Sequence, residues 1–261
     1  MRAVGLKQSI LLSFATLGSL INFCDLLMAG GTSREDHSEV GSGFIHFNFT
    51  PWGRSGDKAT PSLIGDVTAG VFLRQRRIFL GGQAGLIGPR SVGYGSMTGA
   101  GQVVRRDVAA GTLSIQVARA VDQPLERPGD ARVQPVVEKN VAYIAQLRAL
   151  EAFYAGVRLG CARRAGRADL VVIYEEALVN LGACVAERIA RLKSFLREHG
   201  GAPLPDLPPV SAAPACPLAL DGAAGEADHV KWIKSLADAD VARGQAWLES
   251  VASGVRARLL P

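Results

Sequence analysis

The most regular pattern in the chain is a six-residue spacing of apolar and β-prone positions between residues 78 and 108. Leu86, Val92, Thr98 and Val104 recur every six residues, with glycines close behind several of them. This period fits neither an amphipathic helix, which repeats every 3.6 residues, nor an alternating strand, which repeats every two. It is typical of a parallel β-helix, in which three short strands form one coil of about eighteen residues and small residues turn the corners.

The same glycine-rich, β-prone character extends from residue 9 to residue 108, and we expect one β-helix domain over this range. Two stretches interrupt the pattern, at 50–61 and 68–79, and the first is rich in turn-forming residues. Loops that leave a regular stack often carry function, because the stack itself is structural. From 109 to 135 the composition shifts to Pro, Asp, Gln and Arg, which predicts an irregular connection.

A helical region is expected over residues 136–261. Apolar residues three or four positions apart run through 137–161 and again through 170–196, as one face of a helix requires. The second run ends at "HGG" (199–201), a typical helix stop. The proline-rich stretch 202–217 predicts a linker, and a last amphipathic segment spans roughly 226–260. Such apolar seams predict core or oligomer contacts.

Composition narrows the function. The 261 residues are 48% hydrophobic and 20% charged, which supports a folded core. Scattered arginines, a net charge of +5 and only 6% aromatic residues argue against nucleic-acid binding and favour small anionic ligands. The four cysteines form no CxxC pair and indicate free thiols in a reducing compartment.

The N-terminal apolar run (1–23) resembles a signal peptide, and secretion is one alternative. However, Ser, Thr, Gly and Asn interrupt it, no A-x-A site follows, and it is too short and polar to span a bilayer. We therefore expect a cytoplasmic protein without a membrane partner.

The densest polar segment, residues 30–66, contains two of the four histidines, His37 and His46. An imidazole near a carboxylate can act as a general base, because its pKa lies near neutral pH. Alternatively, each histidine fills a structural position. The two are nine residues apart and no third ligand accompanies them, so no metal site is expected.

The blocks "EVGSGFIHFNF", "DKATPSLIGD" and "IFLGGQAGLIGPRSVGYGSMTGAGQVVRRDV" together resemble a known domain. It is the left-handed β-helix (hexapeptide-repeat) acetyltransferase domain of the bifunctional N-acetylglucosamine-1-phosphate uridylyltransferase/glucosamine-1-phosphate acetyltransferase family. The resemblance covers roughly residues 20–108. It implies a left-handed parallel β-helix, followed in this chain by the helical C-terminal region. It also implies homotrimers that bind acetyl-CoA between neighbouring subunits, with a sugar phosphate or nucleotide sugar alongside.

The resemblance also implies positions for the acyl-CoA contacts. The family's turn before its Asn-Tyr pair matches residues 40–43, which include Ser42, and the pair itself matches Asn48 and Phe49, with Phe49 in place of the tyrosine. The family's acyl-CoA-contacting serine falls at Gly82, and a later small residue falls at Ala100.

For the substrate and the base, the resemblance is less complete. Lys58 precedes the Ile-Gly-Asp block as in the family, and with Glu39 it is the expected substrate-binding pair. The position of the family's catalytic histidine is occupied by Asp25, a weaker base at neutral pH. His46, His37 and Asp25 are therefore the candidate catalytic residues.

Two functions follow from the sequence. The first is an acyl-CoA-dependent acyltransferase acting on an amino-sugar phosphate or nucleotide sugar. The second is a non-catalytic trimerisation or regulatory module. No glycine-rich nucleotide-binding domain precedes the matched region, so no uridylyltransferase activity is expected, and the chain is interpreted as a fragment or a stand-alone relative of the family.

Overall fold

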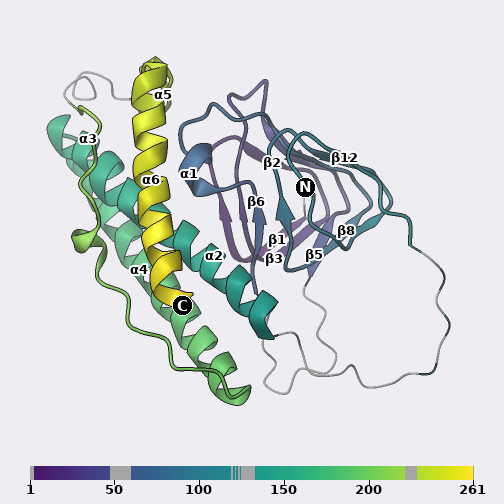
Figure 1. Ribbon diagram of the computed structural model, residues 1–261. Helices are drawn as coiled ribbons and strands as arrows, with labels where there is room; N and C mark the ends of the chain where they lie inside the picture. Colours follow the sequence, from purple (N-terminus) through teal and green to yellow (C-terminus); the bar gives the residue numbers. More distant parts are fainter. Residues whose placement is uncertain are drawn as a thin grey trace. The chain divides into compact units, whose positions relative to one another are not determined.

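The computed structural model describes residues 3–47, 60–118, 120, 122, 124, 133–220 and 228–260. The chain forms two compact units, residues 1–139 and 140–261. The first is built mainly of short strands and the second of helices (Figure 1).

The strands of the first unit are all parallel. They form two sheets. The seven-stranded sheet contains β1 (Val4–Leu11), β3 (Ile21–Met28), β5 (Ile45–Phe47), β6 (Ser62–Ile64), β8 (Gly85–Ile87), β9 (Ser91–Val92) and β11 (Val103–Val104). The five-stranded sheet contains β2 (Ala15–Leu17), β4 (Ser38–Val40), β7 (Phe79–Leu80), β10 (Met97–Thr98) and β12 (Leu113–Ser114). The short helix α1 (Val67–Gly70) follows β6.

The expected left-handed β-helix is wrong as the fold class. The structure has two parallel sheets, with strands ordered β11-β8-β5-β3-β6-β9 in the larger one and β1 beside β3. Strand β3 is eight residues long and pairs with β5 through Asn22 and with β6 through Leu26 to Met28. One long strand therefore lies beside two short ones, which departs from the expected regular coil of three short strands. The six-residue spacing of residues 86–104 does not extend to this part of the chain.

The spacing does identify buried positions correctly. Leu86, Val92, Thr98 and Val104 are each no more than 2% exposed. Leu86, Val92 and Val104 belong to one hydrophobic cluster that also contains Phe23 and Phe44. The prediction that these side chains share an interior is confirmed.

The second unit is helical, as the apolar periodicity predicts. Its elements are α2 (Val133–Phe153), which begins in the first unit, a π-helical turn η1 (Tyr154–Arg158), α3 (Leu159–Arg164), α4 (Ala168–Glu198), α5 (His229–Ser235) and α6 (Asp238–Leu259). The expected proline-rich linker contains a single 3-10 turn, Val210–Ala212. No helix in the described ranges is long and apolar enough to cross a membrane.

Aromatic contacts join the long helices. The guanidinium of Arg188 on α4 lies 5.6 Å from the ring centre of Tyr143 on α2. Gly156 in η1 lies against Trp247 of α6, where an added Cβ would stand 3.1 Å from the ring. In Figure 1 these helices run side by side within the unit. The buried face of α4 is therefore directed at α2 and η1.

Candidate functional site

Three of the predicted acyl-CoA contacts form a column at one edge of the first unit. Ser42 follows β4, Gly82 follows β7 and Ala100 follows β10, and these three strands are neighbours in one sheet. The carbonyl of Ser42 accepts a hydrogen bond from the Gln83 N–H at 2.7 Å, and the carbonyl of Gly82 accepts one from the Gly101 N–H at 3.0 Å. Each of the three residues therefore stands two positions after the end of its strand, and the three strands are neighbours in the sheet.

The backbone segments that follow these neighbouring strands approach one another closely. A Cβ on Gly41 would stand 2.4 Å from the Gly82 nitrogen, and one on Gly81 would stand 2.5 Å from the Ala100 nitrogen. Ser42 and Ala100 are exposed and Gly82 is half-buried. Neighbouring strands lie about 4.8 Å apart, so the column is about 10 Å long. It presents small side chains to solvent, which lets an extended ligand approach the backbone.

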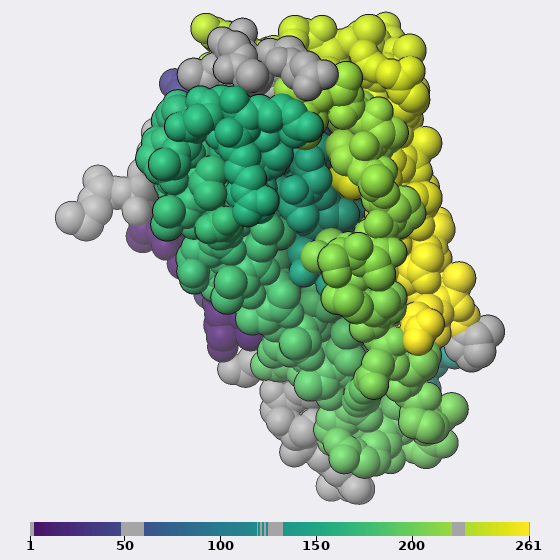
Figure 2. Space-filling model, turned by 90° about the vertical axis from the view of Figure 1, so that its left-hand side faces the viewer, coloured from purple at the N-terminus to yellow at the C-terminus, as the bar shows by residue number. Residues whose placement is uncertain are grey.

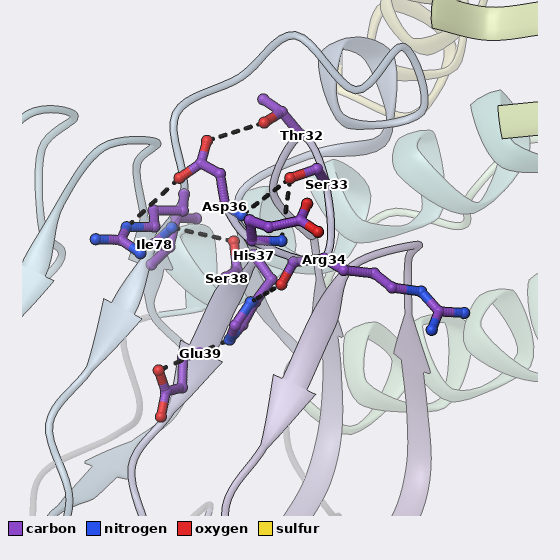
Figure 3. A network of polar contacts seen from close by, with 10 residues as sticks. Thr32, Ser33, Arg34, Asp36, His37, Ser38, Glu39 and Ile78 are labelled. Atoms are coloured by element: carbon purple, nitrogen blue, oxygen red, sulfur yellow. Dashed lines mark hydrogen bonds and ion pairs between the residues drawn. The ribbon is translucent and has the colours of Figure 1, made fainter. Parts of the chain in front are cut away.

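His37 lies in the polar network of Figure 3, just before β4. Its Nδ1 lies 2.6 Å from the backbone carbonyl oxygen of Arg34, and its Nε2 lies 3.8 Å from Oε2 of Glu39. The side chains of His37 and Glu39 are 27% and 45% exposed, respectively. Glu39 is two residues beyond His37, and alternate residues of an extended chain share a face, so the sequence places the two side chains together.

These contacts fix the tautomer of His37. A carbonyl oxygen can only accept, so Nδ1 carries a proton, and in the neutral imidazole Nε2 is then the nitrogen with the lone pair. This is the arrangement of an oriented general base.

The same network is held by residues around His37. The Asp36 carboxylate accepts from the Thr32 hydroxyl at 2.9 Å and lies 3.6 Å from Nε of Arg77. The Ser38 hydroxyl accepts from the Ile78 N–H at 3.0 Å, which joins β4 to the chain before β7. His37 therefore stands on a segment that is fixed on both sides.

His46 on β5 has a different environment. It is 1% exposed, and its Nε2 lies 2.7 Å from the hydroxyl of Ser62 on β6. The same hydroxyl oxygen accepts from the Arg90 N–H at 2.9 Å. Nδ1 is buried and has no hydrogen-bond partner among the described atoms. Burial lowers the pKa of His46 to about 4.

Asp25, at the position of the family's catalytic histidine, is 2% exposed and is engaged by neighbouring groups. It lies within β3 with a φ of +53°, where the pairing of β3 with β1 skips one position. The structure therefore brings neither Asp25 nor His46 to a surface where a substrate could reach it. Among the three predicted catalytic residues, His37 alone is accessible.

The remaining predicted contacts, Asn48, Phe49 and Lys58, lie outside the described residues. Glu39, predicted to bind substrate, lies beside His37. Ser62 was not predicted, because it is 16 residues from His46 and only the strand pairing brings the two together. Within the described ranges, no group of three or more His, Cys, Asp or Glu residues is arranged to hold a metal ion.

No family model matches the chain. Part of it is similar to a curated protein, the "Bifunctional protein GlmU" of Clavibacter sepedonicus, with 31% identity over 117 residues. The alignment covers 43% of this chain and 21% of that protein. The chain thus spans about a fifth of the length of the relative it matches. The comparison supports a distant GlmU-like relationship over less than half of the chain.

Proposed function

We propose that this chain is a transferase of nucleotide-sugar metabolism that moves an acyl group from acyl-CoA to the amine of an amino-sugar phosphate or nucleotide sugar. The observation that carries the proposal is the column of Ser42, Gly82 and Ala100. The resemblance selected these three residues, which are successively 40 and 18 positions apart in the sequence, and they occupy equivalent positions after adjacent strands. The similarity to part of a GlmU protein supports the same class of reaction.

The column suits a pantetheine arm. Its side chains are small, so amides of the arm can lie close to the backbone, and Ser42 can donate or accept a hydrogen bond. His37 stands at the other end of β4, about 16 Å away along the extended chain. That separation is comparable with the length of an extended pantetheine arm, which would place the thioester near His37.

His37 supplies the proton transfer. As the substrate amine attacks the thioester carbonyl, the new C–N bond forms and Nε2 of His37 takes the amine proton. Glu39 stabilises the imidazolium. When the C–S bond breaks, the proton passes to the CoA sulfur, so the imidazole returns to its neutral form. In this proposal Asn48, Phe49 and Lys58 keep the contacts that the resemblance implies.

The second candidate, a non-catalytic module, is supported by Asp25. The position that carries the base in the resembling family holds a buried, engaged carboxylate here. A chain that retained ligand binding and had lost the reaction would show this pattern.

A direct test mixes the purified protein with acetyl-CoA and glucosamine 1-phosphate and measures free CoA by chromatography. We expect release that requires the amino sugar and falls about 100-fold or more in His37→Gln. His46→Gln, assayed where it is folded, should retain turnover. Release that is unchanged in His37→Gln would exclude the assigned base.

Calorimetry separates binding from chemistry. Ser42→Asp should weaken acetyl-CoA binding, because it places a carboxylate beside an anionic ligand, and Ser9→Asp, outside the column, serves as the control. Binding without release would favour the non-catalytic module. No binding to the wild type would exclude both the transferase and the column.

A further inference from the structure

Helix α4 carries an exposed apolar face that the other described elements of the helical unit leave open. Val172, Ile173 and Val179 are 67%, 58% and 65% exposed, respectively. Val172 and Val179 lie opposite the buried face of the same helix, which contains Tyr174, Leu181, Val185 and Leu192. The helix, in green, lies on the surface drawn in Figure 2.

This face has the spacing of a helix-pairing seam. From Val172 the exposed positions are separated by four or three residues in alternation, and they continue with small side chains. The members of the seam are Val172, Glu176, Val179, Ala183, Ala186 and Ala190. The larger side chains occupy the first half of the seam and alanines occupy the second half. In an antiparallel pair of α4 helices, the large side chains of one copy would therefore face the alanines of the other.

The charges on α4 are also divided between the halves. Residues 168–182 contain Asp169, Glu175 and Glu176 and no Lys or Arg, so this half carries −3. Residues 183–198 contain four basic and two acidic residues, so this half carries +2. Two copies in parallel would place like charges together, whereas two antiparallel copies place the acidic half beside the basic half.

A groove beside the basic half of α4 could receive the acidic end of α4 from a second copy. Ala190, Lys193, Leu196 and Arg197 of α4 line a hollow of about 690 Å³ together with residues 200–204. Lys193 binds Asp206 at 2.7 Å, and Asp169 binds Arg167 at 2.6 Å. The Lys193–Asp206 pair is exposed, and such a pair is weak and can be exchanged for a contact across an interface. Asp169 accepts two hydrogen bonds from Arg167 and keeps an exposed carboxylate.

We propose that α4 pairs with α4 of a second copy of this chain, antiparallel, about a two-fold axis that crosses the seam at the level of residue 181. In this register Val179 faces Ala183 of the second copy, Val172 faces Ala190, and Asp169 faces Lys193. Each large side chain meets a small one, and the acidic first turn meets the basic groove.

The size of the contact sets its strength. The paired stretch of α4, from Asp169 through the seam to Lys193, is about 36 Å long at 1.5 Å per residue. A single helix pair of this length buries roughly 1,000 Å² in total, at the lower end of specific interfaces. The dimer is therefore concentration-dependent, with dissociation in the micromolar range. It is independent of the proposed acyl transfer and of the expected homotrimer.

Sedimentation equilibrium of the full chain over roughly 5 to 500 µM tests the proposal across the dissociation range of such an interface. We expect a mass that rises toward twice 27.5 kDa. Val179→Glu should halve the high-concentration mass, whatever larger assembly is present, because it places a carboxylate in the centre of the seam. Val117→Glu is the matched control, an exposed valine elsewhere in the chain. A mass that Val179→Glu leaves unchanged would overturn the proposal.

A charge exchange tests the antiparallel orientation. Asp169→Lys and Lys193→Asp should each weaken association about fivefold to tenfold at low salt, because each creates two repulsive pairs in the dimer. The double variant should restore it. Circular dichroism verifies that each variant keeps its helix content. Two weakened single variants without recovery in the double variant would exclude this register.

Discussion

The imidazole Nε2 of His46 and the hydroxyl oxygen of Ser62 lie 2.7 Å apart inside the first unit. The two residues belong to β5 and β6, which pair with opposite ends of the long strand β3. The bond therefore connects the two short strands across the segment 48–59. It also occupies the nitrogen of His46 that faces Ser62, which is why the proposed reaction uses His37 as its base.

Replacing Ser62 by alanine should destabilise the protein. The change removes the acceptor of the Arg90 N–H and the partner of His46 Nε2, so two buried polar groups lose their hydrogen bonds. We expect a loss of about 2 to 4 kcal/mol in the free energy of unfolding. Urea denaturation at pH 7 measures it. Ser9→Ala, at the surface, should cost less than about 0.5 kcal/mol, and equal effects of the two changes would contradict the role of Ser62.

Stability should fall on mild acidification because His46 is buried in its neutral form. Its pKa is lowered from 6.5 to about 4, so the unfolded chain binds the proton first. The stabilisation is complete above pH 6.5 and is lost as the pH falls from 6.5 toward 4. The change amounts to about 3 kcal/mol at 1.36 kcal/mol per pH unit. Unfolding curves of the wild type and His46→Gln between pH 7 and 4.5 should converge, and parallel curves would exclude the effect.

His229 should add a second acid-sensitive point, in the helical unit. Burial, reinforced by Arg158, lowers its pKa to about 3, and its ring lies 5.9 Å from that of Phe153. Protonation again favours the unfolded chain as the pH falls below 6.5. His229→Phe keeps an aromatic ring at this position and should flatten the pH dependence of the far-ultraviolet transition of the helices. An unaltered slope would show that another group dominates.

The sequence predicts the buried positions better than it predicts the strand pairing. Leu86, Val92, Thr98 and Val104 are identified because their spacing reflects which side chains point inward. Residues 21–28 do not follow that spacing, and nothing local indicates that they form one strand beside two others. Pairing between distant segments is a tertiary property, and extending a local period over the whole unit produced the wrong fold class.

The same limit applies to the site. The pairing of His37 with Glu39 is local and could be found from their spacing. The burial of His46 depends on Ser62 and Phe23, which lie far from it in sequence. On α4, periodicity identifies the buried side, whereas the exposed valines are visible only when the opposite side is examined in the structure.

Tyr94→Phe should release the segment that leads into α1. The Tyr94 hydroxyl donates to the Asp66 carbonyl at 2.7 Å and accepts from the Asp66 N–H at 3.0 Å. Asp66 in turn caps α1 by accepting from the Ala69 N–H at 2.8 Å. Loss of the hydroxyl should cost about 1 to 3 kcal/mol. Thr112→Val removes an exposed hydroxyl as a control, and a Tyr94→Phe effect as small as that of the control would contradict the assignment.

Three glycine-to-alanine changes should differ in sign because the surroundings of the glycines differ. At Gly81 a Cβ would stand 2.5 Å from the Ala100 nitrogen and from the Gly99 backbone. The segment after β7 must therefore move away from the segment after β10. The expected loss is about 2 to 3 kcal/mol. Gly101 has open space and a φ of +68°, so only backbone strain of about 1 to 2 kcal/mol applies. Gly254 lies within α6 with nothing within 4 Å, so alanine should stabilise that helix by about 0.5 to 1 kcal/mol.

Denaturation with separate probes for strands and helices would test this order, since Gly81 and Gly254 lie in different units. Gly81→Ala should also weaken acetyl-CoA binding under conditions where the protein stays folded, because it separates Gly82 from Ala100 within the proposed contact column. Gly254→Ala should leave that binding unchanged. If Gly81→Ala lowers stability and acetyl-CoA still binds with wild-type affinity, the close spacing of the layers is structural and the ligand lies elsewhere.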